Sequence, residues 1–162
     1  MPIQRVSYIP DDNSEDYQLH VNSGINFNNY DTIYVRVTGN DIPDSISSLD
    51  DFQIPDFLKA NIRSAEYKKL TPVQKYTIPI IDRGRDIMAC AQTGSGKTVA
   101  FLVPIIKNIV EIPDENPSNR NAPKCIVLVP TRELCRQIFT VAHRLCQGSS
   151  LRCAYAYGGI EM

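Results

Sequence analysis

One eight-residue segment of the chain has the composition and spacing of a phosphate-binding loop. Glycines let a loop turn its N–H groups inward without a Cβ clash, and a helix that begins after the loop directs its positive end at the phosphates. Lys97 stands where a cation covers the β- and γ-phosphate oxygens, and Thr98 where a hydroxyl ligates Mg²⁺. The segment therefore predicts binding of a nucleoside triphosphate, with Lys97 and Thr98 as catalytic residues and Thr98 as the metal ligand. Its members are Ala91, Gln92, Thr93, Gly94, Ser95, Gly96, Lys97 and Thr98.

The residues around this loop favour the same role. An apolar run at Asp86–Ala91 is typical of a buried strand, and the apolar run at Lys97–Ile109 is typical of a helix packed against a sheet. The alternative is a chance glycine turn, because Ala91 stands where the general motif has glycine. The strand, loop and helix in this order favour nucleotide binding. They do not distinguish a nucleotide kinase, a GTPase, an AAA-type ATPase or a helicase.

Further motifs, taken with this loop, resemble boxes of the DEAD-box RNA helicases. The loop looks like motif I of that family, and Tyr67–Gln74 resembles its Q motif. The resemblance implies that the Gln74 amide reads adenine and that Tyr67 stacks on the adenine ring. An amide suits this role because it offers a donor and an acceptor together. ATP and Mg²⁺ are the cofactors that the resemblance implies.

Two later motifs resemble the boxes that grip the RNA sugar-phosphate backbone in this family. A helix that begins at Thr131 would direct free N–H groups at a phosphate, Arg132 would add charge, and glycines would allow close approach of a backbone. The alternatives are a simple helix cap at Thr131 and a simple turn at Gly158-Gly159, and both stay open. The expected RNA-binding residues are Pro130, Thr131, Arg132 and Glu133, similar to motif Ia, and Gly158 and Gly159, similar to the glycine doublet.

The segment upstream of these boxes is similar to the lead of the Vasa and Belle subfamily, and Tyr8-Ile9-Pro10 with its acidic spacer favours Vasa. Some positions depart from the family pattern. Glu66 and Leu70 replace a glycine and a proline of the Q motif, and an upstream aromatic that supports the adenine pocket aligns with Leu49. Phe52 is the candidate substitute for that aromatic.

The resemblance implies an ATP-dependent RNA helicase that couples ATP hydrolysis to local unwinding of RNA. It would bind RNA single strands or short duplexes by their backbone. Its partners would be ribonucleoproteins, and it would not bind a membrane. It would reside in the cytoplasm, at germ granules or near the nucleus. The 162 residues contain no Asp-Glu-Ala-Asp box. We therefore expect this chain alone to be catalytically incomplete. The alternatives are a non-catalytic truncated product that binds ribonucleoproteins or nucleotide, and another P-loop enzyme such as a nucleotide kinase.

The elements that must position these residues follow from periodicity and turn signals. Helices are predicted at 55–64, 72–82, 97–109 and 132–145, and strands at 86–91, 124–129 and 151–157. Strands that alternate with helices predict an α/β fold, an incomplete RecA-like (P-loop) domain with a parallel sheet. Residues 1–48 are expected to form a mostly extended acidic lead, and residues 49–162 the N-terminal portion of the ATP-binding domain, truncated before the acidic box. An open sheet edge and poor solubility in isolation are expected.

Composition adds constraints on location and partners. Residues 1–56 carry 2 Lys/Arg against 10 Asp/Glu, whereas residues 57–162 carry 15 against 8, so a basic body follows an acidic lead. This pattern fits a polyanionic partner or, equally, a solvated surface with an acidic tail. The five cysteines include no C-x-x-C pair, which argues against a zinc site and against a disulfide framework. Several are expected to be small buried side chains, and the protein is expected in a reducing compartment. The longest apolar run, Val99–Ile106, is too short to span a bilayer.

Overall fold

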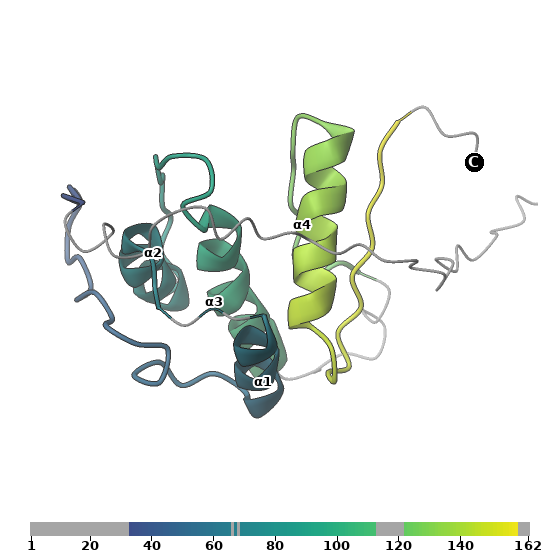
Figure 1. Cartoon of the computed structure of the whole chain (residues 1–162), viewed down its shortest axis with the longest axis horizontal. Coiled ribbons are helices and arrows are strands. Elements are labelled where there is room, and N and C mark those ends of the chain that lie inside the picture. The colour runs from purple at the N-terminus through teal and green to yellow at the C-terminus, as the bar shows by residue number, and fades with distance from the viewer. Residues whose placement is uncertain (1–32, 66, 68, 113–121, 159–162) are drawn as a thin grey trace, which may run out of the picture.

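A computed structural model describes residues 33–65, 67, 69–112 and 122–158 of the chain (Figure 1). These ranges contain four α-helices: α1 (Asp56–Ser64), α2 (Pro72–Asp82), α3 (Lys97–Glu111) and α4 (Arg132–Leu145). All four predicted helices are confirmed, with ends within two residues of the predicted ones. Most of the predicted lead, residues 1–32, lies outside the described residues, and its remainder, 33–48, contains neither helix nor strand.

Local signals explain where two of the helices begin. Thr71 is the N-cap of α2, Pro72 takes the first helical position, and the Gln74 side chain accepts a hydrogen bond from the Thr71 N–H at 2.9 Å. Thr131 is the N-cap of α4, and its hydroxyl accepts a hydrogen bond from the Leu134 N–H at 3.2 Å. In α2 the Gln74 side chain pairs the N–H of the N-cap residue, and in α4 the Thr131 hydroxyl pairs an N–H of the first turn. These N–H groups have no backbone partner within the helix.

The hydrophobic core lies where α3 meets the other helices. Helix α3 packs against α2 and α4, and α1 packs against α4. Leu58 of α1 and Ile78 of α2 are fully buried, as are Val103 of α3 and Leu145 of α4. Apolar residues recur at three- and four-residue spacing along the helices, so each helix turns an apolar face to this core.

The predicted strands are not formed as β-strands in the described part of the chain. Residues 86–91, 124–129 and 151–157 are non-helical and have no β-ladder between them. The prediction that 86–91 is buried was wrong, because all six residues are exposed; Met88 is 92 % exposed, and Leu128 of the second segment 90 %. A parallel strand is buried when neighbouring strands and covering helices flank it, and no described segment pairs with 86–91.

The same exposure corrects the expectation that the cysteines are buried. Cys90 and Cys125 lie on the first two extended segments and are exposed. Cys146 is buried, and Cys135 and Cys153 are intermediate. Burial of these thiols therefore depends on packing against α4 and the core, and an apolar sequence context alone does not produce it.

The arrangement of the helices brings three loops to one side of the molecule. Figure 1 shows that α3 and α4 both begin at the upper side, and that the extended segment 151–157 ends on that side. The loop before α3, the segment that leads into α4 and the end of segment 151–157 therefore lie at the same side, as the carboxyl ends of parallel strands would. Among the described helices, none has the length and apolar character needed to cross a membrane.

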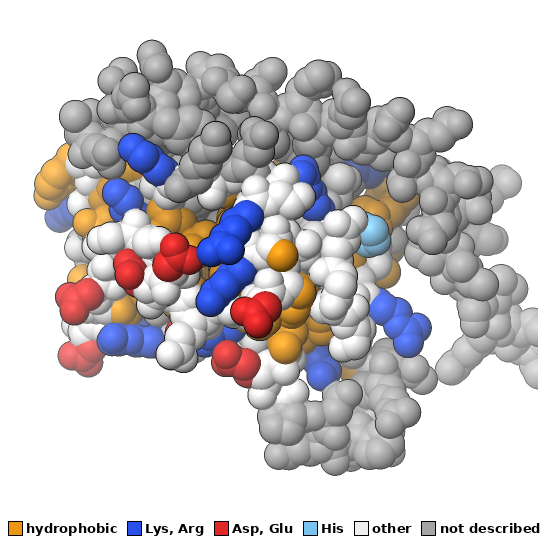
Figure 2. Space-filling model, turned by 60° about the horizontal axis from the view of Figure 1, so that its bottom comes forward, with side chains coloured by type: hydrophobic (Ala, Val, Ile, Leu, Met, Phe, Trp, Pro, Cys, Tyr) orange, Lys and Arg blue, Asp and Glu red, His pale blue; other side chains and the backbone are white. Residues whose placement is uncertain are grey.

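The surface carries charges of both signs. In the view of Figure 2, acidic and basic side chains alternate with small hydrophobic areas and form no continuous basic patch. The excess of basic residues after Phe57 is therefore not gathered on this face. Any attraction of a polyanion there must depend on individual side chains and helix ends.

Candidate functional site

The phosphate-binding loop has the backbone conformation that its glycines allow. Gly94 and Gly96 have φ angles of 79° and 85°, in the left-handed region that favours glycine. The Ser95 N–H donates to the Gln92 carbonyl at 3.3 Å, which closes a turn. Gly96 is the N-cap of α3, and no side chain caps the first turn of that helix. The first-turn N–H groups of α3 are thus left to bind an anion.

Lys97 lies against the loop that precedes it. Its ammonium donates hydrogen bonds to the Ala91 carbonyl and, at 2.6 Å, to the Gln92 carbonyl. Its side chain is half-buried, and the hydroxyl-bearing Thr98 follows it in the first turn of α3. A phosphate group in the loop would compete with these two carbonyls for the ammonium, because an anion is the stronger acceptor.

Gln74 joins the predicted Q motif to the phosphate-binding loop. Its side chain is 3 % exposed, and its Nε2 donates to the Gly96 carbonyl at 3.2 Å. A Cβ added at Gly96 would lie 2.4 Å from this nitrogen, so a side chain at this position would displace the Gln74 amide from the contact. The bond uses one of the two N–H groups of the amide. The role of Gln74 in reading adenine stays a prediction, and the structure adds a second role in holding the loop.

Two buried hydroxyls lie beside this contact. Within the described residues, Thr71 Oγ1 and Ser95 Oγ are buried and have no hydrogen-bond partner. The Thr71 hydroxyl is 3.3 Å from the position that a Cβ on Gly96 would occupy. A buried polar atom without a partner in a native protein calls for water, an ion or a ligand. Together with the uncapped α3, these hydroxyls make the loop a chemically suitable site for a nucleotide phosphate and its metal ion.

The two aromatic residues considered for the adenine pocket lie in or against the core. Tyr67 is half-buried against the core, where burial raises the pKa of its phenol and the charge of Arg144 partly offsets this rise. Phe52 is a buried core residue, and the Lys107 ammonium lies 5.2 Å from its ring centroid. No described contact joins Tyr67 to the phosphate-binding loop. Stacking of Tyr67 on adenine therefore stays a prediction.

The two predicted RNA-binding boxes are adjacent in the structure. Residues 130–133, at the start of α4, and Gly158 are all exposed, whereas Gly159 lies outside the described residues. The Arg132 guanidinium lies 5.6 Å from the ring centroid of Tyr157, the residue before Gly158. The Thr131 hydroxyl caps α4, which is the alternative to RNA binding that the sequence left open for this side chain. The Thr131 backbone and the first-turn N–H groups other than that of Leu134 are the part of α4 that fits a phosphate.

Sequence reasoning missed the residues that hold these boxes together. Arg136 donates to the Tyr157 hydroxyl, with its Nε at 3.1 Å, and its guanidinium lies 5.4 Å from the Tyr157 ring centroid. Tyr155 stacks on Tyr157 at 5.7 Å, and Phe139 meets Tyr155 edge-on at 4.6 Å. The spacing of these residues offered a signal. Arg132 and Arg136 are four residues apart, a spacing that places side chains on one face of a helix. Tyr155 and Tyr157 are two residues apart, a spacing that places side chains on one face of an extended segment.

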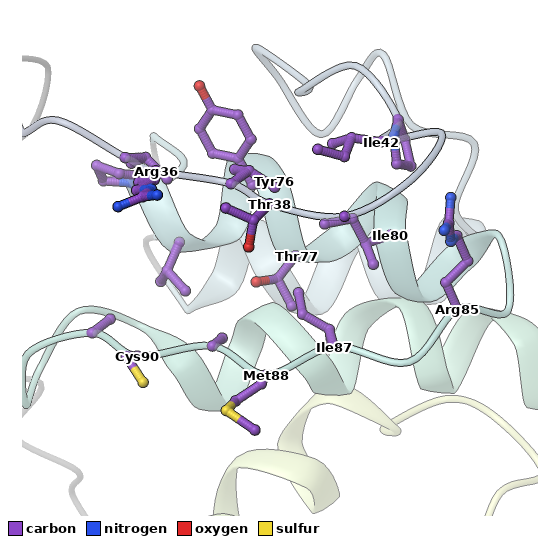
Figure 3. Close-up of a pocket in the computed structure, with 18 of the residues that line it drawn as sticks. Arg36, Thr38, Ile42, Tyr76, Thr77, Ile80, Arg85, Ile87, Met88 and Cys90 are labelled. Atoms are coloured by element: carbon purple, nitrogen blue, oxygen red, sulfur yellow. The ribbon is translucent and has the colours of Figure 1, made fainter.

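A pocket of about 550 Å³ adjoins the phosphate-binding loop (Figure 3). It lies between segment 33–43, helix α2 and segment 85–92, and it reaches Ser95. Figure 3 shows Met88 and Cys90 pointing away from α2 on one side of their segment, as alternate residues of an extended chain do. The pocket thus lies along an extended segment that leads into the loop.

Comparison with known proteins places these features in a family. The DEAD/DEAH box helicase family model matches residues 71–162, more than half of the chain. The fold is similar to that of the RNA helicase Prp28 from Chaetomium thermophilum bound to ADP, with a TM-score of 0.59 and 35 % identity, covering 67 % of this chain and 26 % of that one. The chain belongs to the DEAD/DEAH box helicase family.

Curated relatives extend the similarity over nearly the whole chain. It is 45 % identical, over 98 % of its length, to the probable ATP-dependent RNA helicase DDX4 of Homo sapiens. It is 42 % identical, over 96 % of its length, to the ATP-dependent RNA helicase vasa of Drosophila melanogaster. These alignments cover 22 % and 24 % of the two relatives, so the chain spans less than a quarter of their length. The predicted resemblance to Vasa is confirmed.

Proposed function

We propose that this chain carries the ATP-binding site and part of the RNA-binding surface of an ATP-dependent RNA helicase. The observation that carries the proposal is the contact of buried Gln74 with Gly96 at the uncapped start of α3. It joins the Q motif to the phosphate-binding loop, which a general P-loop protein would not require. The names of the relatives, ATP-dependent RNA helicases, supply the reaction.

Each residue of the loop has a role that its position supports. The N–H groups from Gly94 to Thr98 bind phosphate oxygens, and Lys97 leaves the Ala91 and Gln92 carbonyls to cover them. Thr98 holds Mg²⁺ through its hydroxyl, and Gln74 reads adenine with its second N–H. Bound ATP supplies the free energy for strand separation when it is hydrolysed.

The RNA-binding surface follows from the proximity of the two boxes. The start of α4, with Arg132, binds one backbone phosphate, and Gly158-Gly159 allows the next part of the strand to approach closely. The contacts reach phosphates and sugars, so little sequence preference is expected. We place this activity in cytoplasmic ribonucleoprotein assemblies such as germ granules, which co-sedimentation with RNA before and after ribonuclease treatment would test.

We also infer that segments 86–91, 124–129 and 151–157 are the strands of a parallel RecA-like sheet. Support comes from the position of the loops that follow them on one side of the molecule, and from the similarity to Prp28. Amide hydrogen exchange tests for the sheet directly. The N–H groups that donate ladder hydrogen bonds exchange slowly, and at least every second residue of a paired strand has such a group. Exchange as fast as in an unstructured peptide at all three segments would refute the sheet.

The nucleotide site is tested by binding of a fluorescent ATP analogue to the 162-residue chain. Lys97→Ala is expected to weaken binding about tenfold or more, because a charge-assisted contact to phosphate is lost. Gln74→Ala is expected to weaken ATP binding and to reduce the preference for ATP over GTP. Lys59→Ala, at a half-buried position on α1 outside the proposed site, is the matched control for the loss of a lysine. Unchanged ATP affinity in Gln74→Ala would contradict the proposed role of Gln74 in reading adenine. It would not contradict the proposed phosphate site.

A further inference from the structure

Four aromatic rings form a continuous row between α4 and the extended segment that runs beside it (Figure 1). The ring centroids of Tyr157 and Tyr155 are 5.7 Å apart, and those of Tyr155 and Phe139 are 4.6 Å apart. The row continues from Phe139 to His143, whose ring centroids are 5.8 Å apart. Because Tyr157 directly precedes Gly158, this aromatic row begins at one of the two predicted RNA-binding boxes.

The aromatic row keeps part of its surface in water. His143 is exposed, and the other three rings are half-buried. The hydrophobic core and the residues packed against it include none of the four rings. Rings that only fill a core lie inside it, whereas adjoining rings that stay partly exposed present apolar surface to a ligand. The aromatic row therefore fits a flat, partly apolar ligand.

Positive charge surrounds the start of the aromatic row. The guanidinium groups of Arg132 and Arg136 lie 5.6 Å and 5.4 Å from the ring centroid of Tyr157. From Arg132 to the last ring, the side chains recur along α4 at spacings of four, three and four residues, which places them on one face of the helix. Residues 130–158 contain four arginines and one glutamate, without lysine or aspartate. Aromatic rings within a basic surface are the combination that binds single-stranded nucleic acid.

We propose that the aromatic row is a base-stacking surface for single-stranded RNA, along which the strand continues from the two boxes toward His143. This inference rests on the proposed RNA binding and adds base contacts to the backbone contacts of the boxes. Continuity with the boxes and the excess of arginine favour an RNA strand over a protein partner. From Arg132 to His143 the helix rises roughly 16 Å, which accommodates several stacked nucleotides. Every base has a π-face, so these contacts add little sequence preference.

Comparison of RNA with and without bases tests the proposal. A short single-stranded RNA and a strand of the same length with consecutive abasic nucleotides are titrated with the 162-residue chain, and fluorescence anisotropy gives both affinities. The boxes contact the backbone and bind both strands, whereas the aromatic row binds only the bases. Affinity for the abasic strand is expected to be about fivefold lower or more. Equal affinities would overturn the base-stacking proposal and would not contradict the proposed backbone binding, whereas binding of neither strand would overturn both.

Substitutions in the aromatic row show whether the loss arises there. His143→Ala removes an exposed ring, and Phe139→Leu removes a ring but keeps an apolar side chain. Each is expected to lower affinity for the RNA with bases about threefold or more, and to leave affinity for the abasic strand unchanged.

Gln137→Ala is the matched control for these substitutions. Gln137 is exposed on α4, but it follows Arg136 by one residue and therefore lies on a different face of the helix. This variant should bind both strands as the original chain does. The proposal would be overturned if His143→Ala bound the RNA with bases as tightly as Gln137→Ala does, or if it lost affinity equally for both strands.

Discussion

Arg136 of α4 donates a hydrogen bond to the hydroxyl of Tyr157, at 3.1 Å from Nε. The two residues are twenty-one positions apart, and each lies near one of the two predicted RNA-binding boxes. The same ring lies 5.6 Å from the Arg132 guanidinium. The contact therefore fixes Gly158 relative to the start of α4, and a change in it should alter RNA binding without altering the nucleotide site.

Tyr157→Phe removes the acceptor for Arg136 and keeps the ring. Affinity for single-stranded RNA is expected to fall about threefold to tenfold, since a hydrogen bond to a charged group at an exposed position is worth about 1 kcal/mol. Affinity for the ATP analogue should not change. Tyr34→Phe is the matched control, because Tyr34 is 87 % exposed. Fluorescence anisotropy with a labelled oligonucleotide measures both variants, and equal RNA affinity in the two would show that the contact has no role in positioning.

Gly96→Ala combines backbone strain with a steric clash at Gln74. The left-handed φ of 85° costs about 1 kcal/mol for alanine, and the added Cβ would lie 2.4 Å from Gln74 Nε2. We expect at least a tenfold loss of ATP affinity. Gly84→Ala is a sharp control, because Gly84 has a φ of 67° but no atom within 4 Å of an added Cβ. If both variants bound the analogue equally, the contact of Gly96 with Gln74 would be dispensable.

Alkylation of Cys153 should depend on pH around neutrality. A thiol reacts as its thiolate, and the pKa of Cys153 is lowered to about 7, so the rate with iodoacetamide should rise from pH 6 to pH 8 with a midpoint near pH 7. Cys146→Ala removes the thiol donor whose hydrogen bond lowers this pKa, so the midpoint should shift upward. Mass spectrometry of the peptide that follows Arg152 provides the rate. A midpoint that stays near pH 7 in Cys146→Ala would mean that another group lowers the pKa.

Truncation of a core residue tests the packing of α2. Ile78 is fully buried, and Ile78→Ala should lower the free energy of unfolding by about 2–5 kcal/mol through lost burial and a cavity. Ile33→Ala makes the same chemical change at a residue that is 50 % exposed, and an effect below about 0.5 kcal/mol is expected. Urea denaturation followed by circular dichroism measures both. Comparable losses would place Ile33 in the core as well.

The 162-residue chain should show no RNA-stimulated hydrolysis of ATP. The sequence has the phosphate-binding loop but no Asp-Glu-Ala-Asp box to hold the metal ion and orient water. Release of phosphate from ATP, measured with and without single-stranded RNA, should stay at the level of the Lys97→Ala variant. A rate above that level, increased by RNA, would show that the 162 residues contain a complete catalytic site.

The sequence by itself determined the four helices and the phosphate-binding loop. Their signals are local: Thr71 and Thr131 act as caps within one turn, apolar residues repeat with the helical period, and the loop is a contiguous motif. The motifs also identified the family, because a family is recognised from residues in order along the chain. Local interactions of this kind do not depend on how the elements later pack.

The tertiary structure decided which distant side chains meet. Gln74 reaches Gly96, Arg136 reaches Tyr157, and these contacts depend on the packing of helices that the sequence does not place relative to one another. Packing also decided burial. The apolar segment around Met88 predicts a buried strand, yet Met88 is exposed, as is Leu128 of segment 124–129, because an extended segment is covered only by elements that pack on it. Local pattern therefore fixes the secondary structure of the helices, whereas long-range contacts fix the site.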